Sequence, residues 1–213
     1  MLCACAVLTY TTLSYVLAPQ VKRQKQFAEF TKARHNKYTP EGNILGNKDA
    51  EIIVHVYSDY RCPMCKAYDV MIAKLATKEF KNIRVEHHNM PLDTECNRYM
   101  RAEFHKGSCM MARYAIAAEK QGKLWAMNSK LFEKQPNNEK EILEIAKELN
   151  LDTEKLTDDA LSLETQRLIN EDIERAAQLG IDGTPATVIN GKAEVGIKPY
   201  DKMKEWLKSE GAK

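Results

Sequence analysis

The stretch YSDYRCPMC, residues 57–65, gives the strongest indication of how this chain folds. It joins a β-rich segment, residues 51–57, to apolar residues at helical spacing that continue to about Phe80. Pro63 suits the first turn of a helix, where its missing N–H leaves no hydrogen bond unmade. The sequence therefore predicts a buried strand, a turn, and a helix that begins between Cys62 and Cys65.

The segments that follow extend this pattern to a whole domain. Each is recognised by its hydrophobic period, by turn residues at its ends, or by both. The predicted elements are a strand at residues 83–87, a helical block at about 107–180, hairpin strands at 186–189 and 193–195, and a C-terminal helix that buries Met203, Trp206 and Leu207. This order is a βαβ unit and a ββα unit separated by a helical insertion, which predicts an α/β protein of thioredoxin fold.

The helical insertion carries its own start and stop signals. Asn138 can cap the helix that contains Ile142 and Ile145, and Gly180 can close the last helix. The last helix is expected to be long and to bury one apolar face, formed by Ile169, Ile173 and Ala176.

The 213 residues divide into three parts on this interpretation. Residues 1–21 form an apolar membrane-anchor segment, residues 22–48 a connector that ends in a loop, and residues 49–213 the thioredoxin-like domain with its insertion. A chain of this length is sufficient for one well-buried domain.

The N-terminal segment predicts a membrane helix ahead of the domain. Residues 1–21 contain no charged side chain and approach the roughly 20 residues that span a bilayer. A cleavable signal peptide would begin with a basic region, which is missing, so an uncleaved anchor is predicted, with a buried core helix as the alternative. Lys22, Arg23 and Lys25 oppose an extracytoplasmic domain by the positive-inside rule. That conflict weakens if the chain is the tail of a longer membrane protein.

Charge and cysteine content narrow the function classes. The 32 basic and 30 acidic residues are interleaved, so no basic block suggests nucleic-acid binding. The six cysteines fall into three pairs, which are Cys3 with Cys5, Cys62 with Cys65, and Cys96 with Cys109. A C-x-x-C pair together with a wider pair suits an oxidising compartment. Cys3 and Cys5 are interpreted as small hydrophobes of the apolar segment.

The Cys62/Cys65 pair predicts redox chemistry. Cys62 precedes the helix and Cys65 lies one turn into it, so the unpaired N–H groups of the helix start can stabilise a thiolate at Cys62. The more exposed Cys62 is expected to exchange with a disulfide, and Cys65 to resolve the mixed disulfide. The alternative is a zinc site, for which His87, His88, His105, Cys96 and Cys109 are the available further ligands.

Two motifs in this order resemble the DsbA-type disulfide oxidoreductases. They are residues 57–65 and residues 183–191, GTPATVING. The resemblance covers about residue 49 to the C-terminus and is strongest to the thioredoxin-like modules associated with, or fused to, bacterial vitamin K epoxide reductase homologues. It implies that Pro185 is a cis-proline facing the dithiol and that Thr184 and Pro185 bind an extended substrate peptide.

The resemblance also implies a disulfide between Cys96 and Cys109. A loop of this size, once closed, stabilises the fold by about 3 kcal/mol in the chain-entropy model, so a structural bond is one interpretation. The other is a second redox pair that passes electrons from Cys62 and Cys65 to a membrane partner. His105 either tunes Cys109 or is a solvated loop residue.

Two positions depart from the family pattern. Met64 replaces a histidine between the cysteines and can donate no hydrogen bond to Cys62, which predicts a less acidic thiol. Val56 stands where relatives often carry a buried acid, which puts a proton relay through that position in doubt. His55 and Asp59 are candidate substitutes, with structural roles as the plainer interpretation.

The sequence thus predicts a protein thiol–disulfide oxidoreductase with a C-P-M-C dithiol, oxidation being the favoured direction. No cofactor and no metal are expected. The expected partners are substrate protein thiols and, from the resemblance alone, a quinone-linked membrane protein of the DsbB or vitamin K epoxide reductase type. The expected location is the periplasm, with the domain anchored in the membrane by its N-terminus. The alternatives are a disulfide reductase or isomerase with the same site, and a metal-binding thioredoxin-fold module.

Overall fold

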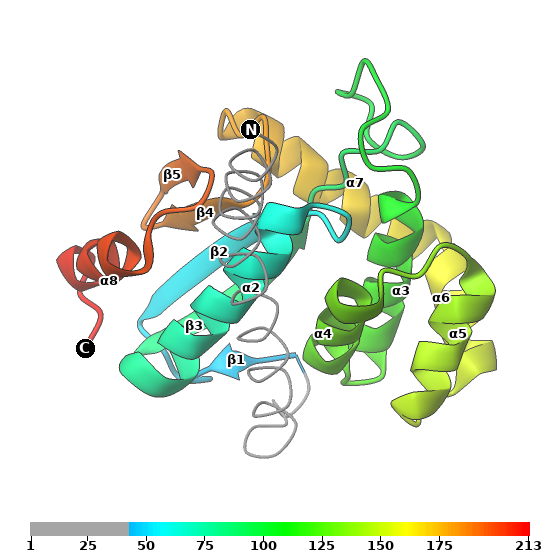
Figure 1. Ribbon diagram of the computed structural model, residues 1–213, viewed down its shortest axis with the longest axis horizontal. Helices are drawn as coiled ribbons and strands as arrows, with labels where there is room; N and C mark the ends of the chain where they lie inside the picture. The colour runs from blue at the N-terminus through cyan, green and yellow to red at the C-terminus, as the bar shows by residue number, and fades with distance from the viewer. Residues whose placement is uncertain (1–42) are drawn as a thin grey trace, which may run out of the picture. The chain divides into compact units, whose positions relative to one another are not determined.

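A mixed five-stranded sheet organises the computed structural model, which describes residues 43–213. The strand order is β1-β3-β2-β4-β5; β2 and β3 are parallel, and the other neighbours are antiparallel (Figure 1). The strands are β1 (Leu45–Gly46), β2 (Ile52–Ser58), β3 (Ile83–Asn89), β4 (Ala186–Ile189) and β5 (Lys192–Val195). The predicted βαβ and ββα units are therefore confirmed, and they share one sheet.

The helix after β2 begins where the sequence indicates. α2 (Pro63–Lys74) has Pro63 in its first turn and continues as a π-helical segment, η1 (Leu75–Glu79). The amide of Phe80 donates to the carbonyl of Leu75, a wider turn than in an α-helix. The hydrophobic period predicted the extent of this helix but not its widened end.

The predicted helical insertion consists of five helices between β3 and β4. They are α3 (Ser108–Lys120), α4 (Leu124–Lys134), α5 (Glu139–Glu148), α6 (Thr153–Leu161) and α7 (Leu163–Gln178). Asn138 caps α5 by accepting a hydrogen bond from the amide of Glu141, as expected. Ile169, Ile173 and Ala176 are buried on one face of α7, which confirms that prediction.

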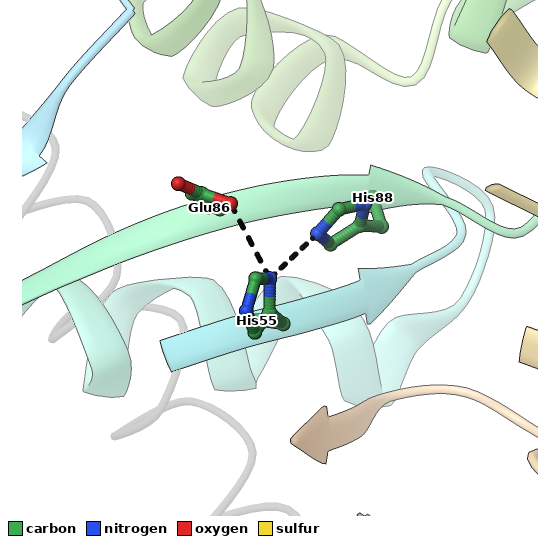
Figure 2. A group of neighbouring side chains, drawn as sticks. All are labelled: His55, Glu86 and His88. Carbon is green, nitrogen blue, oxygen red and sulfur yellow. Dashed lines mark hydrogen bonds and ion pairs between the residues drawn. The ribbon is translucent and has the colours of Figure 1, made fainter. Parts of the chain in front are cut away.

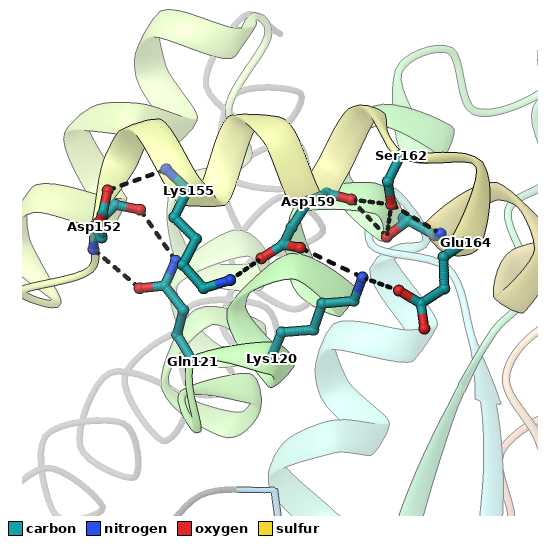
Figure 3. A network of polar contacts seen from close by, with 8 residues as sticks. Lys120, Gln121, Asp152, Lys155, Asp159, Ser162 and Glu164 are labelled. Atoms are coloured by element: carbon teal, nitrogen blue, oxygen red, sulfur yellow. Dashed lines mark hydrogen bonds and ion pairs between the residues drawn. The ribbon is translucent and has the colours of Figure 1, made fainter.

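A polar network ties the end of α3 to the capped starts of α6 and α7 (Figure 3). Lys120 reaches both Asp159, at 3.4 Å, and Glu164, at 2.6 Å. The amide of Asp152, the α6 cap, donates to the side chain of Gln121 at 3.0 Å. Each of these contacts links two elements of the insertion.

The C-terminal ββα unit closes the fold. Asn190 and Gly191 form the hairpin turn with φ angles of 50° and 77°, the left-handed region that a type I′ turn requires. In α8 (Tyr200–Ser209), Met203 and Leu207 are buried as predicted. Trp206 is only half-buried and lies under the ammonium group of Lys198, so its predicted burial is wrong.

The two faces of the sheet carry different layers. The hydroxyl groups of Tyr68 in α2 and Thr187 in β4 contact each other, and Tyr68 also contacts Met203 of α8, so α2 and α8 share one face. On the other face, Tyr57 and Val188 pack with Ala176 of α7. Alternating side chains of β2 therefore point to faces covered by different helices.

β1 lies within the connector that was expected to be loop. Gly46 has a φ of +100°, and a Cβ there would approach the carbonyl oxygen of Ile83 to 2.5 Å, so the close pairing with β3 requires glycine. A two-residue strand has too few positions to show an alternating pattern, which explains why the sequence did not reveal it.

The predicted anchor, residues 1–21, and most of the predicted connector lie outside the described residues. Cys3 and Cys5 lie outside them as well. Among residues 43–213, no helix is long and apolar enough to cross a bilayer.

Candidate functional site

Cys62 lies at the junction of β2 and α2. It is the N-cap of α2, and its Sγ accepts a hydrogen bond from the amide of Cys65 at 3.4 Å. The backbone geometry of an N-cap directs the side chain toward the free N–H groups of the first turn. The predicted placement of one thiol before the helix and the other one turn into it is confirmed.

This setting makes Cys62 an acidic thiol. A hydrogen bond from the thiol of Cys65 is the largest cause that lowers the pKa of Cys62, and backbone amides of the first turn add to it. Burial acts in the opposite direction, yet the pKa of Cys62 falls to about 6. At neutral pH a large fraction of Cys62 is therefore thiolate.

Cys65 behaves in the opposite way. Burial is the main cause that raises the pKa of its thiol, and its hydrogen bond to Cys62 raises it further. The amide of Asp59 lies 3.5 Å from its Sγ. Both cysteines are buried, with Cys62 6% and Cys65 1% exposed. The sequence predicted that Cys62 would be the more exposed; the difference in exposure is small, and the difference in acidity is large.

The predicted peptide-binding loop, which contains Thr184 and Pro185, follows the inserted helices in the sequence and lies next to the dithiol. The Thr184–Pro185 bond is cis, as the family resemblance implied. The Sγ of Cys62 lies 3.5 Å from the carbonyl oxygen of Thr184, although the two residues are 122 positions apart. Cys62, Cys65 and Thr184 are thus brought together in one place.

The side chains of Asp59 and His105 contact each other beside the dithiol. Asp59 is 1% exposed and accepts hydrogen bonds from the amides of Arg61 and Leu92, each at 2.6 Å. The same carboxylate contacts His105: Nδ1 of His105 lies 3.1 Å from Oδ2 of Asp59. His105 is thus partly buried against Asp59, which corrects the interpretation of a solvated loop residue; a tuning role toward Cys109 stays a prediction.

The pair raises the pKa of His105. The contact with the Asp59 carboxylate is the largest cause, and the negative charge of a Cys62 thiolate contributes in the same direction. His105 thus keeps its proton to higher pH than a free histidine and places positive charge near Cys62. Sequence reasoning named Asp59 as a possible relay residue but gave no sign that His105 would meet it.

Arg61 connects the dithiol turn to the insertion. Its guanidinium donates to the carbonyl oxygens of Gln135, at 3.1 Å, and Pro136, at 2.6 Å. Gln135 donates in return to the carbonyl oxygen of Tyr60 at 2.6 Å. Nothing in the sequence distinguishes Arg61 from a surface arginine, because its partners are backbone atoms of a distant loop.

Among residues 43–213, the other histidines form no group of metal ligands with the dithiol. The ring of His87 stacks on Tyr60 and meets Trp125 edge-on, and burial lowers the pKa of His87 to about 4. Within residues 43–213, a set of three potential metal ligands occurs at His55, Glu86 and His88, and it contains no cysteine. The alternative of a zinc site built on Cys62 and Cys65 gains no further ligand from the described residues.

Cys96 and Cys109 form a disulfide, as the resemblance implied. The S–S distance is 2.06 Å and the Cα atoms are 5.9 Å apart. The bond joins the loop after β3 to the first turn of α3, and Oδ2 of Asp93 accepts from the amides of Gly107 and Cys109 in the same loop. The bond thus holds the segment that carries His105.

Comparison with known proteins gives one consistent family. A family model described as DSBA-like thioredoxin domain matches residues 53–208. Disulfide bond formation protein D of Bacillus subtilis (strain 168) is 27% identical over 177 residues, which cover 78% of this chain and 76% of that protein. The crystal structure of a thioredoxin-like oxidoreductase from Silicibacter pomeroyi DSS-3 matches with a TM-score of 0.67 and 28% identity, covering 80% of this chain and 92% of that one.

A further relative is much longer than this chain. The Na(+)/H(+) antiporter NhaA 1 of Salinispora arenicola (strain CNS-205) is 27% identical over 155 residues. The match covers 72% of this chain and 22% of that protein. The similarity is therefore to one portion of the antiporter.

Proposed function

Since this chain belongs to the DsbA-like thioredoxin domain family, whose members are thiol–disulfide oxidoreductases, we propose that Cys62 and Cys65 form its redox-active pair. Cys62 is the sulfur that exchanges with substrate, and Cys65 is the resolving thiol. The observation that carries this assignment is the opposite displacement of the two pKa values, lowered at Cys62 and raised at Cys65.

The proposed reaction oxidises a substrate dithiol. A substrate thiolate attacks Sγ of Cys62 in the Cys62–Cys65 disulfide, and the electron pair of the broken S–S bond leaves on Cys65, which takes up a proton. A second substrate thiolate then attacks the substrate sulfur of the mixed disulfide and releases Cys62 as thiolate. The substrate loses two electrons and two protons and gains a disulfide, and the enzyme is left as the dithiol.

The acidity of Cys62 favours this direction. A thiol whose pKa is about 6 is a good leaving group at neutral pH, and stabilising its thiolate stabilises the reduced enzyme. A stabilised reduced form makes the disulfide form the stronger oxidant. The same residues can also reduce or isomerise disulfides. The reduction potential of the Cys62/Cys65 couple, rather than the geometry of the site, distinguishes these activities from oxidation.

The proposed peptide-binding surface surrounds the dithiol. Thr184 and Pro185 present the loop whose carbonyl lies against Cys62. Two exposed apolar side chains are close to site residues in sequence: Met64, 49% exposed, lies two residues after Cys62, and Phe104, 69% exposed, precedes the His105 that contacts Asp59. Exposed apolar groups next to a reactive thiol suit an unfolded protein substrate, whose own apolar side chains are accessible.

We propose an extracytoplasmic location and attachment to a membrane through residues 1–21. The Cys96–Cys109 disulfide supports an oxidising compartment. The charge-free stretch at residues 1–21 and the similarity to part of a membrane antiporter support a chain joined to a membrane protein. A quinone-linked partner of the DsbB or vitamin K epoxide reductase type would return the dithiol to the disulfide.

The test is the reduction potential of the Cys62/Cys65 couple, measured against glutathione. We expect a value clearly more oxidising than the about −270 mV of thioredoxin, together with oxidation of a reduced two-cysteine peptide by the disulfide form. A potential at or below that of thioredoxin would assign the site to reduction instead.

A further inference from the structure

Three potential metal ligands meet on the sheet face that the dithiol chemistry does not use. His55 of β2 is paired in register with Glu86 of β3, and His88 lies two residues further along β3 (Figure 2). Alternation along each strand turns these side chains away from the α2 face, where Val54 and Val56 are buried. They lie instead on the face covered by α7, with Tyr57 and Asp172.

The separations of the ligand atoms match those around a small tetrahedral ion. Nδ1 of His55 is 3.0 Å from Nε2 of His88 and 3.3 Å from Oε2 of Glu86, and the three atoms all lie within 4.8 Å of one another. Zinc–nitrogen bonds of about 2.0–2.1 Å in a tetrahedron place neighbouring ligand atoms about 3.3 Å apart. Two of the three distances between ligand atoms are therefore already near the value that a tetrahedral zinc ion requires.

The contacts of His88 hold its ring in the orientation that a ligand needs. Its Nδ1 lies 2.7 Å from Oδ1 of Asp172, whose Oδ2 accepts from the amide of Asn89 at 2.8 Å. Its ring stacks on Tyr57 with centroids 4.8 Å apart. A proton on Nδ1, donated to Asp172, leaves the lone pair on Nε2, which faces His55. A carboxylate behind a ligating histidine is the usual outer partner in zinc sites.

The other two ligands are also prepared. Arg84 binds Oε1 of Glu86 at 2.7 Å, which leaves Oε2 directed at His55. Burial is the main cause that lowers the pKa of His55 below its ordinary value. Arg84 and Arg175 place positive charge nearby, and the carboxylates of Glu86 and Asp172 offset it.

Each of the three residues borders a hollow of the surface. His55 lines one surface hollow, Glu86 and His88 line a second one, and Arg175 borders both. The side chains of His55 and Glu86 are 30% and 37% exposed, so an ion and a water molecule can reach the cluster.

We propose that His55, Glu86 and His88 bind one zinc ion, with water as the fourth ligand. Binding replaces the proton shared between Nδ1 of His55 and its two neighbours, and that proton is released to solvent. The ion links β2 to β3 on the face opposite α2, so it stabilises the sheet without entering the dithiol chemistry.

The experiment measures zinc binding to the full chain with Cys62 and Cys65 oxidised and Cys3 and Cys5 alkylated, so that no free thiolate can coordinate. The variants are His55→Gln and Glu86→Gln. The matched control is Glu171→Gln, because Glu171 lines the same hollow as Glu86 but pairs with Arg167. We expect one zinc ion per chain for the wild type and the control, and affinity lower by roughly tenfold or more in the two ligand variants.

A second measurement needs no substitution. In the wild type, zinc should shift the ¹⁵N resonances of Nδ1 in His55 and Nε2 in His88, and leave those of His87 and His105 in place. The proposal is overturned if the oxidised wild type takes up no zinc, if His55→Gln binds zinc as tightly as the wild type, or if the two histidine resonances do not move.

Discussion

The amide of Cys65 donates a hydrogen bond to the sulfur of Cys62 across 3.4 Å, so the resolving residue also stabilises the thiolate of its partner. The thiol of Cys65 acts in the same direction and is the largest cause of the low pKa of Cys62. The two cysteines are therefore unequal before any substrate arrives, and this inequality is open to direct tests.

The first test separates the roles of the two cysteines. Cys65→Ser should keep a reactive Cys62 and accumulate mixed disulfides with substrate proteins, because no resolving thiol remains. Cys62→Ser should abolish exchange and trap nothing. Non-reducing electrophoresis after incubation with a disulfide-containing substrate gives the readout. Trapping by Cys62→Ser and not by Cys65→Ser would reverse the assignment.

Residue 64 should control how oxidising the couple is. Met64→His adds a side chain that can donate a hydrogen bond beside Cys62, so the thiolate and the reduced form should gain stability. We expect a lower pKa of Cys62 and a more oxidising potential. Met64→Leu is the matched control, since it keeps an apolar side chain. Equal potentials in both variants would show that this position has no influence.

His105 should support the Cys62 thiolate through its charge. Asp59 is the largest cause that raises the pKa of His105, and a thiolate at Cys62 acts in the same direction. His105→Gln removes this charge and should raise the pKa of Cys62, which shifts the pH profile of thiol alkylation to higher pH. Lys106→Gln, an exposed change of charge in the same loop, should leave the profile in place. A shift of equal size in both variants would assign the effect to net charge alone.

The Cys96–Cys109 bond is expected to be structural. Replacing both residues with alanine should lower the free energy of unfolding by about 3 kcal/mol, while Cys62 and Cys65 still exchange with a peptide at nearly the wild-type rate. Thermal denaturation and peptide oxidation measure the two effects. A relay predicts a different outcome: stability would barely change, peptide exchange would survive, and reoxidation by a membrane partner would fail.

Local patterns predicted most of the elements but few of the contacts between them. The strand before Cys62, the helix after it, the Asn138 cap and the Asn190 turn all depend on neighbours in sequence, and all were recovered. The pairing of His105 with Asp59 joins two loops, and neither loop has a period that fixes its position.

The histidine cluster shows a second limit of sequence reasoning. His55 lies in a predicted strand, and His88 directly follows the other predicted strand, which in the structure continues to Asn89. Alternation along each strand could therefore place each histidine on one face of the sheet. Their meeting also needs the register of β2 against β3, which pairs His55 with Glu86. A shift of one residue would have sent the side chains of one strand to the other face.

The contact between Cys62 and Thr184 spans 122 positions, so the site cannot be complete until almost the whole chain has been made. At about 5–20 residues per second, synthesis reaches Thr184 roughly 6 to 24 s after Cys62. During that interval Cys62 lacks the part of its stabilisation that comes from Thr184. We expect chains arrested at residue 183 to be alkylated more slowly at Cys62 than completed chains. The order of synthesis would thereby delay the reactivity of the thiol until the domain that confines it has formed.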